Sequence, residues 1–223
     1  MSIATPTRSD ADIKTAVLDE LDWTPEVDAT GIGVAVDDGA IALSGEVDNY
    51  SARIAAKDAA LRVRGVRAVV DNVNVHPSWS SSVTEPDIAK EVEHALTWAS
   101  TVPDTVKAEI QGHDITLTGQ VVWDFQRRAA QRAVQHLNGV NYVNNLVTLP
   151  PRVSAPDTER RIRDAITRNA QLDADSITGA VSGREVTLTG TVRSWAEKRA
   201  AERAAWASPH VSEVQDRIAV QLF

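Results

Sequence analysis

The sequence contains no cysteine, one methionine, two tyrosines and two phenylalanines among its 223 residues. Without cysteine the chain has no disulfide framework, no thiolate metal site and no cysteine nucleophile. No stretch approaches the roughly 20 apolar residues of a membrane-spanning helix. The N-terminal ten residues also lack the apolar run of a signal peptide. We therefore expect a cytoplasmic protein with no transmembrane segment.

Positive charge is also scarce. The chain has 23 Lys and Arg residues against 31 Asp and Glu, a formal net charge of -8. Nucleic-acid binding rests on dense positive charge, so this balance argues against nucleic acid as the main partner. It weakens binding to anionic membranes without excluding it.

One stretch occurs three times, as Ile41–Val47, Ile115–Val121 and Val186–Val192. In each copy an apolar residue alternates with a small or polar one, and the stretch ends on Gly-x-Val. This alternation is typical of a strand that is buried on one face. The surrounding region aligns without gaps over residues 41–75, 115–149 and 186–220. The repeat therefore predicts three small domains, where length alone would suggest one or two.

Each repeat begins with a helix signal, a hydroxyl residue followed three positions later by an acid. The three copies are Ser9-x-x-Asp12, Thr84-x-x-Asp87 and Ser154-x-x-Asp157. The hydroxyl can accept a backbone N–H, and the acid suits the positive end of the helix. Apolar residues then recur at every fourth position, as a helix face requires. They are Ile13, Val17 and Leu21, then Ile88, Val92 and Leu96, with Ile162 and Ile166 in the third copy.

A hairpin, an alanine-rich helix and a last strand complete each repeat. The hairpin turns are predicted at Asp38-Gly39, Gln111-Gly112 and Ser182-Gly183, because glycine supplies the positive φ of a tight turn. The alanine-rich helices are predicted over residues 51–63, 124–137 and 195–207. A strand, helix and strand in this order form a crossover between parallel strands.

The predicted fold class is therefore α+β, with three tandem αββαβ repeats. Each repeat forms a three-stranded mixed sheet with two helices on one face. The domains are predicted over residues 8–76, 84–150 and 154–223, with linkers at 77–83 and 151–153. Domains of this size are marginal alone, so we expect the three to pack on one another.

Gly45, Gly119 and Gly190 occupy an inward position of the repeated strand. The missing side chain has two interpretations. The favoured one is structural, with the alanine-rich helix packing closely against the strand at this point. The alternative is a glycine that cradles a ligand.

The pattern resembles the BON domain (bacterial OsmY and nodulation). The resemblance rests on the repeated apolar-x-Leu-[Thr/Ser]-Gly-x-Val strand, the alanine-rich helix, and the Gly-Val of Gly65-Val66 and Gly139-Val140. It also rests on a closing Val-x-x-Val-x-[Asn/Asp] signature in each repeat. His210-Val211 replaces Gly-Val in the third copy. The resemblance implies a non-catalytic module associated with osmotic and envelope stress, phospholipid surfaces, chaperone-like action or small-ligand sensing.

No pattern of a catalytic, metal or cofactor site stands out. The histidines, at positions 76, 94, 113, 136 and 210, share no metal-ligand spacing and are interpreted as surface or packing residues. Gly31-Ile32-Gly33 lacks the third glycine of a dinucleotide loop and leads into a strand. We therefore predict a protein that is not an enzyme, with no cofactor.

The chain is unusually rich in tryptophan, with six residues. Trp23 and Trp98 end the first helices and are predicted to serve in core or inter-domain packing. Trp123 and Phe125, followed by Arg127 and Arg128, could instead form an apolar and basic rim against lipid headgroups or a partner groove. The full candidate lipid or partner surface consists of Trp123, Phe125, Arg127, Arg128, Trp195, Arg53 and Lys57.

Charge also differs between the two helices of a repeat. In the first two copies the first helices are acidic, with Asp19, Glu20 and Asp22 in the first copy, whereas the second helices are basic. The two interpretations are solvated faces and head-to-tail contact between modules. The leading functional hypothesis is a stress-linked binding protein that acts on protein or phospholipid surfaces. The alternatives are a self-assembling or chaperone-like scaffold, and a sensor of small ligands or ions.

Overall fold

The computed structural model describes residues 8–76, 83–150, 160–162, 164, 176–182, 184–207 and 211–221. Domain 1 contains α1 (Asp10–Asp22), the short η1 (Ala29–Gly31), β1 (Ile32–Asp37), β2 (Ala40–Val47), α2 (Tyr50–Arg62) and β3 (Ala68–Val75). Domain 2 contains α3 (Glu85–Trp98), β4 (Lys107–Gln111), β5 (Asp114–Thr118), α4 (Asp124–Val134) and β6 (Tyr142–Asn145). Domain 3 contains β7 (Ile177–Ser182), β8 (Glu185–Val192), α6 (Trp195–Trp206) and β9 (Glu213–Val220), preceded by helical residues 160–162 and 164.

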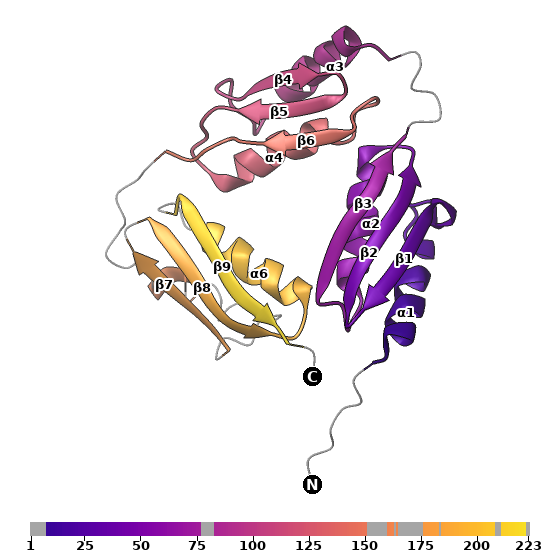
Figure 1. Cartoon of the computed structure of the whole chain (residues 1–223). Coiled ribbons are helices and arrows are strands. Elements are labelled where there is room, and N and C mark those ends of the chain that lie inside the picture. Colours follow the sequence, from indigo (N-terminus) through magenta and orange to yellow (C-terminus); the bar gives the residue numbers. More distant parts are fainter. Residues whose placement is uncertain are drawn as a thin grey trace.

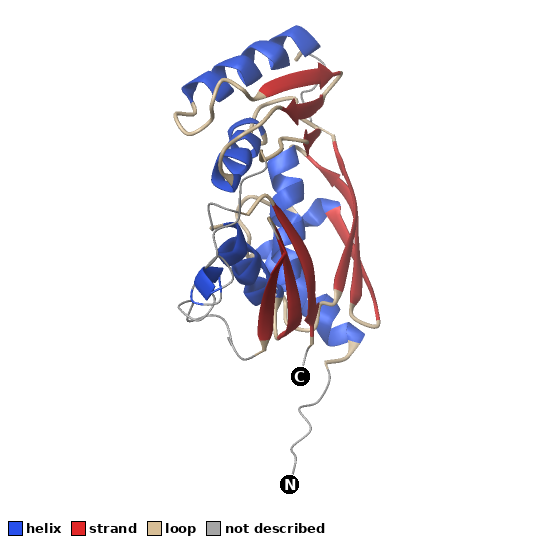
Figure 2. Ribbon diagram, turned by 90° about the vertical axis from the view of Figure 1, so that its left-hand side faces the viewer, coloured by secondary structure: helices blue, strands red, loops and turns tan. Residues whose placement is uncertain are grey.

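Each domain forms one three-stranded sheet with its repeated strand in the centre (Figure 1). The central strand pairs antiparallel with the strand before it and parallel with the strand after the crossover helix. Figure 2 shows the helices mainly to one side and the strands to the other. The α+β fold class predicted from the three tandem repeats is confirmed.

The cores follow the period-2 pattern of the repeated strand. Ile41 and Leu43 are fully buried, and so are their counterparts, which are Ile115, Leu117, Val186 and Leu188. The second helices contribute alanines, including Ala56, Ala130 and Ala201, which are equally buried. Small side chains on the helix allow its axis to lie near the sheet while large side chains of the strand fill the space between them.

The predicted start signals form capping boxes in the first two domains. At α1 the Ser9 Oγ accepts the Asp12 N–H at 3.2 Å, and the Asp12 carboxylate accepts the Ser9 N–H at 3.2 Å. At α3 the Asp87 carboxylate accepts the Thr84 N–H at 3.1 Å and the Thr84 hydroxyl at 2.6 Å. These bonds lower the pKa of both carboxyl groups.

The repeated glycines are required by the backbone, and the expected close approach of a helix is wrong. Gly45 has a φ of 116°, and a Cβ built on it would lie 2.0 Å from the carbonyl oxygen of Gly31, just before β1. Gly119 and Gly190 show the same geometry against Thr105 and Ser176. The backbone that enters the hairpin therefore occupies the space of a side chain, and the φ itself disfavours any residue with a Cβ.

Several sequence predictions fall outside the described residues. They concern the Ser154-x-x-Asp157 signal, Ile166, Gly183, His210, and residues 77–82 and 151–153 of the linkers. Within the described ranges, no helix is both long and apolar enough to cross a membrane.

Candidate interaction surfaces

Domains 1 and 2 meet at the N-terminus of α2. Tyr50, the first residue of α2, packs edge-on against Tyr142 with ring centroids 5.9 Å apart. It is only 7% exposed and joins the hydrophobic core of domain 2. Burial raises the pKa of its hydroxyl. Beside it the Ser51 hydroxyl donates to the Gln135 carbonyl at 3.1 Å and lies 2.6 Å from His136 Nδ1.

Domains 3 and 1 meet at the N-terminus of α6. The indole N–H of Trp195, the first residue of α6, donates to the carbonyl oxygen of Val66 at 3.0 Å. One turn later Arg199 forms an ion pair with Asp58 of α2 at 2.9 Å. Trp195 and Tyr50 hold equivalent positions in the gapless alignment, so the same helix position serves two different contacts.

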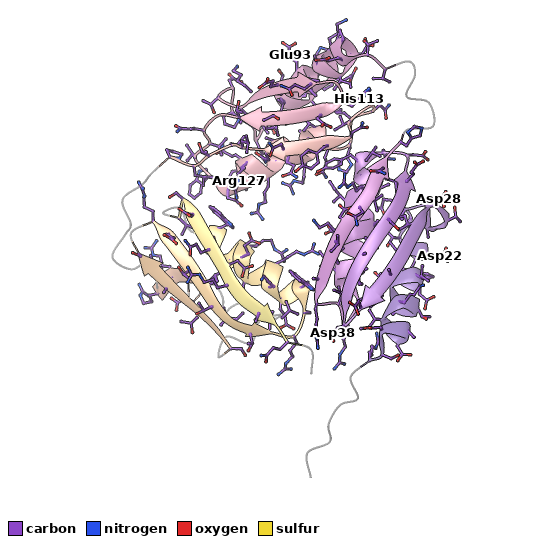
Figure 3. The ribbon with its side chains drawn as sticks, in the orientation of Figure 1. Asp22, Asp28, Asp38, Glu93, His113 and Arg127 are labelled. Atoms are coloured by element: carbon purple, nitrogen blue, oxygen red, sulfur yellow. The ribbon has the colours of Figure 1, made fainter. Side chains whose placement is uncertain are left out.

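Domains 2 and 3 meet near the N-terminus of α4. The guanidinium carbon of Arg127 lies 4.6 Å from the ring centroid of Trp206, at the end of α6. In Figure 3 the label of Arg127 lies on the side of domain 2 that faces domain 3, whereas Asp22 and Asp28 lie on the outer side of domain 1.

The three seams follow one rule. Each joins the start of one second helix to the end of another second helix or the residues after it, in the order α2 to α4, α4 to α6, and α6 to α2. Such head-to-tail contacts are heterologous, because each joins two different surfaces. They form a closed ring when the rotation from each domain to the next returns to the first domain. Figure 1 shows the three domains around a common centre, with β3, β6 and β9 toward it. The chain therefore closes a pseudo-threefold ring on itself.

The closing signature of each repeat has a structural role that the sequence analysis did not assign. Its last residue is Asp71, Asn145 or Asp216, and the side-chain oxygen accepts the N–H two residues later. Asp71 also binds Arg53 at 3.0 Å, and Asp216 lies 3.4 Å from Lys198. The signature thus ties the last strand to the second helix.

The second repeat departs from this pairing. Asn145 carries no charge, and its Nδ2 donates to the main-chain oxygen of Arg127 at 2.9 Å. The Arg127 guanidinium instead pairs with Asp124 and reaches Trp206 of domain 3. The sequence carries a signal of this difference that the sequence analysis did not use. Arg53, Arg127 and Lys198 align, and only Arg127 has an uncharged residue at the signature position of its repeat.

A family model described as the BON domain matches residues 9–77, 84–151 and 154–221. These three segments cover most of the chain and coincide with the three sheets. The chain belongs to the BON domain family.

Two solved structures show a weak similarity to this tandem of BON domains. Both are of CdsD, a structural protein of the type III secretion system of Chlamydia trachomatis. One is 12% identical with a TM-score of 0.28, covering 95% of this chain and 93% of that chain. The other, the C-terminal domain of CdsD, is 13% identical with a TM-score of 0.27, covering 96% and 100%. A search of curated proteins found no match.

The residues of the predicted lipid or partner surface are distributed over several parts of the BON domain ring. Trp123 and Phe125 stack with ring centroids 6.4 Å apart, and Phe125 is exposed. Arg127 and Arg128 both pair with Asp124, whose side chain is 1% exposed. Together they are therefore the partners of a buried carboxylate as well as surface cations.

The other three predicted residues lie elsewhere. Trp195 belongs to the seam between domains 3 and 1, Arg53 pairs with Asp71, and Lys57 is exposed on α2. The seven residues do not form one continuous rim. A lipid or partner role for any of them stays a prediction.

One further sequence interpretation needs correction. Trp23 and Trp98 are each 85% exposed, so they serve neither core nor inter-domain packing in the described structure. The acidic first helix of domain 1 forms an ion pair within its own domain, where Glu20 binds Arg62 at 2.7 Å. Head-to-tail contact between acidic and basic helices stays a prediction. Between domains, Asp58 and Arg199 instead join two second helices.

Two of the histidines in the described ranges take part in local contacts. His113 Nδ1 lies 2.7 Å from the Gly139 carbonyl, and His136 lies in the seam between domains 1 and 2. Across the described residues, no group of three or more His, Asp or Glu side chains is arranged to hold a metal ion.

Proposed function

We propose that this protein is a non-enzymatic interaction protein, in which three BON domains form a closed platform that binds other proteins. The single observation that carries the proposal is the ring itself. The contacts made by Tyr50, Arg127 and Trp195 occupy the second helices. Among the described elements, α1, α3 and the outer strands β1, β4 and β7 make none of these three contacts, so they are available to partners. Membership of the family supports this function, because BON domains bind proteins or phospholipids.

The ring also bears on self-assembly. A heterologous contact between copies would produce rings or filaments, but here that contact closes within one chain. We therefore favour binding of other proteins over a self-assembling scaffold. We extend the proposal to a role in osmotic or envelope stress, for which the family resemblance is the support.

A phospholipid surface is the second candidate, favoured by Trp23 and Trp98. Both indoles are 85% exposed at equivalent ends of the first helices. Exposed tryptophan is suited to the headgroup region, where its ring is apolar and its N–H is solvated. Asp19, Glu20 and Asp22 precede Trp23, so a zwitterionic surface fits better than an anionic one.

Site-specific crosslinking tests the proposal. A photoreactive phenylalanine replaces Trp23 or Trp98 in the full chain, and a matched control replaces Val70, which is 52% exposed on β3. Discrete protein adducts at positions 23 and 98, absent at position 70, are the expected result. Adducts of equal yield at all three positions, or none, contradict a specific protein platform.

Vesicle flotation tests the lipid candidate. Phosphatidylcholine vesicles should carry the native chain, and the W23A/W98A double variant should lose this association while V70A retains it. Equal flotation of all three proteins, or none, eliminates the lipid candidate.

A further inference from the structure

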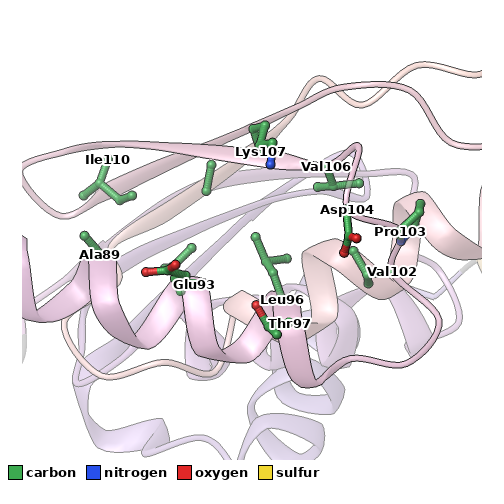
Figure 4. A pocket seen from close by; sticks show the side chains of 12 residues that line it. Ala89, Glu93, Leu96, Thr97, Val102, Pro103, Asp104, Val106, Lys107 and Ile110 are labelled. Atoms are coloured by element: carbon green, nitrogen blue, oxygen red, sulfur yellow. The ribbon is translucent and has the colours of Figure 1, made fainter.

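Domain 2 carries a groove of about 430 Å³ between α3 and β4 (Figure 4). Its lining is largely apolar and includes the buried Val92 and Val106 and the half-buried Leu96 and Ile110. Such a floor can accept apolar side chains from a ligand, because burying them removes their surface from water.

The groove results from smaller side chains at two positions of the strand. Val106 and Ala108 line it, where domain 1 has Ile32 and Val34 at the equivalent positions. The lost methyl groups leave space beside the helix. Val34 is 8% exposed in domain 1, whereas Ala108 is half-buried.

The first helix shows the same difference. Leu21 of α1 is fully buried, and Val27 in the following loop joins the core of domain 1. Leu96, the counterpart of Leu21 on α3, is half-buried and lines the groove. The same fold therefore closes this region in domain 1 and opens it in domain 2.

The strand beside the groove is an edge strand. Among the described strands β4 pairs with β5 alone, and the hairpin closes at the pair Gln111 and Asp114. In a two-residue hairpin the two residues of the closing pair are hydrogen-bonded to each other. Along each strand, residues whose main-chain N–H and C=O groups point toward the partner strand then alternate with residues whose groups point away from it. The N–H and C=O groups of Ala108 and Ile110 therefore point away from β5, toward the open side.

The rim of the groove is predominantly acidic. Glu93 and Asp104 line it together with Lys107, and all three side chains are exposed. A partner with basic residues beside its apolar ones therefore matches the charge of the rim.

We propose that β4 and α3 form a docking site for an extended segment of a partner protein, which adds to the sheet as a fourth strand. Main-chain hydrogen bonds to Ala108 and Ile110 hold the segment, apolar side chains at alternate positions enter the groove, and flanking Lys or Arg residues face Glu93 and Asp104. Strand addition of this kind combines main-chain affinity with side-chain specificity. The site rests on the proposed protein-binding function and identifies one class of partner for it.

Selection from a random ten-residue phage-displayed peptide library on the full chain tests the site. Enriched peptides should carry apolar residues at positions i and i+2 with Lys or Arg nearby. Their binding should fall by about tenfold or more in V106I/A108V, which gives domain 2 the side chains of domain 1. A108P, which removes an outward N–H, should weaken binding through the backbone instead. The control E109Q alters the other face of β4 and should retain most of the affinity.

Three outcomes would overturn the site. They are selected peptides that bind V106I/A108V as tightly as the native chain, a selection that enriches no alternating pattern, and a dimer of this chain that the same variant dissolves. The last outcome would identify a second copy as the occupant. The test at Trp23, in domain 1, involves neither α3 nor β4, so the broader proposed function can survive the failure of this site.

Discussion

Arg127 of domain 2 lies over the indole of Trp206 of domain 3, with 4.6 Å between the guanidinium carbon and the ring centroid. In the described residues of these two domains this contact joins α4 to the end of α6. It depends on a substitution within the repeat, because Asn145 stands where domains 1 and 3 have an aspartate. An uncharged residue there leaves the Arg127 guanidinium available to the neighbouring domain.

The first prediction concerns this substitution. The N145D variant should draw Arg127 back toward its own domain, in the way that Asp71 holds Arg53. The cation–π contact is worth about 0.5–2 kcal/mol, so the seam between domains 2 and 3 should loosen while each domain stays folded. Spin labels on α4 and α6 would report a longer or broader distance distribution. An unchanged distribution would show that Arg127 does not hold the seam.

The second prediction concerns the seam between domains 3 and 1. Replacing Trp195 by phenylalanine removes the N–H that binds the Val66 carbonyl and leaves that oxygen without its partner. The free energy of unfolding should fall by about 1–3 kcal/mol. The control W98F alters an exposed indole and should change stability by less than about 0.5 kcal/mol. Urea unfolding of both variants would distinguish them, and equal values would argue against a role of the Trp195 hydrogen bond.

The third prediction separates glycines by their surroundings. An alanine at Gly45 would place a Cβ 2.0 Å from the Gly31 carbonyl oxygen at a φ of 116°. We expect a loss on the order of 3 kcal/mol or more, because both the backbone conformation and the entry to β1 must change. Gly112 has a φ of 61°, and a Cβ built on it would meet no atom within 4 Å. An alanine there should lower the free energy of unfolding by about 1 kcal/mol. Thermal unfolding of G45A and G112A measures the two losses of stability. Equal losses in the two variants would contradict the prediction.

The fourth prediction concerns acidic pH. The capping bonds lower the pKa of Asp12 and Asp87 below the ordinary value of 3.8, so the folded state binds fewer protons at these groups than the unfolded state. Their stabilising effect is present above pH 3.8 and is lost as the pH falls through the lowered values. Amide signals at the starts of α1 and α3 should report fraying in that range. In the D12N and D87N variants the starts of α1 and α3 should fray already at neutral pH. Amide signals of the native chain that do not change on acidification would refute the assignment.

Much of the fold could be predicted because its signals are local. The alternation of apolar and polar residues in Ile41–Val47 specifies a strand with one buried face. The spacing of four residues between Ile13, Val17 and Leu21 specifies a helix face. Three copies in register then imply one architecture repeated. The crossover rule adds the parallel pair, which the register of β2 and β3 confirms.

The candidate surfaces could not be predicted in the same way, because exposure depends on residues distant in sequence. Trp195 looked like part of a rim, yet its N–H binds a carbonyl 129 residues earlier. Trp23 looked like a packing residue and is almost entirely in contact with solvent. Aromatic side chains suit a core, a seam and a binding face equally well, so composition does not distinguish these environments.

By itself, the sequence determined the three repeated modules, their cores and the capping boxes of the first two, since each follows from spacing within one repeat. Only the tertiary structure decided why Gly45, Gly119 and Gly190 are needed, because the backbone that approaches them comes from the opposite strand of the hairpin. Only the tertiary structure showed the ring, because equivalent helix positions hold Tyr50 in one domain and Trp195 in another and meet different partners. Seams of this kind depend on the shape and charge of two surfaces at once, and neither property is contained in the pattern of a single repeat.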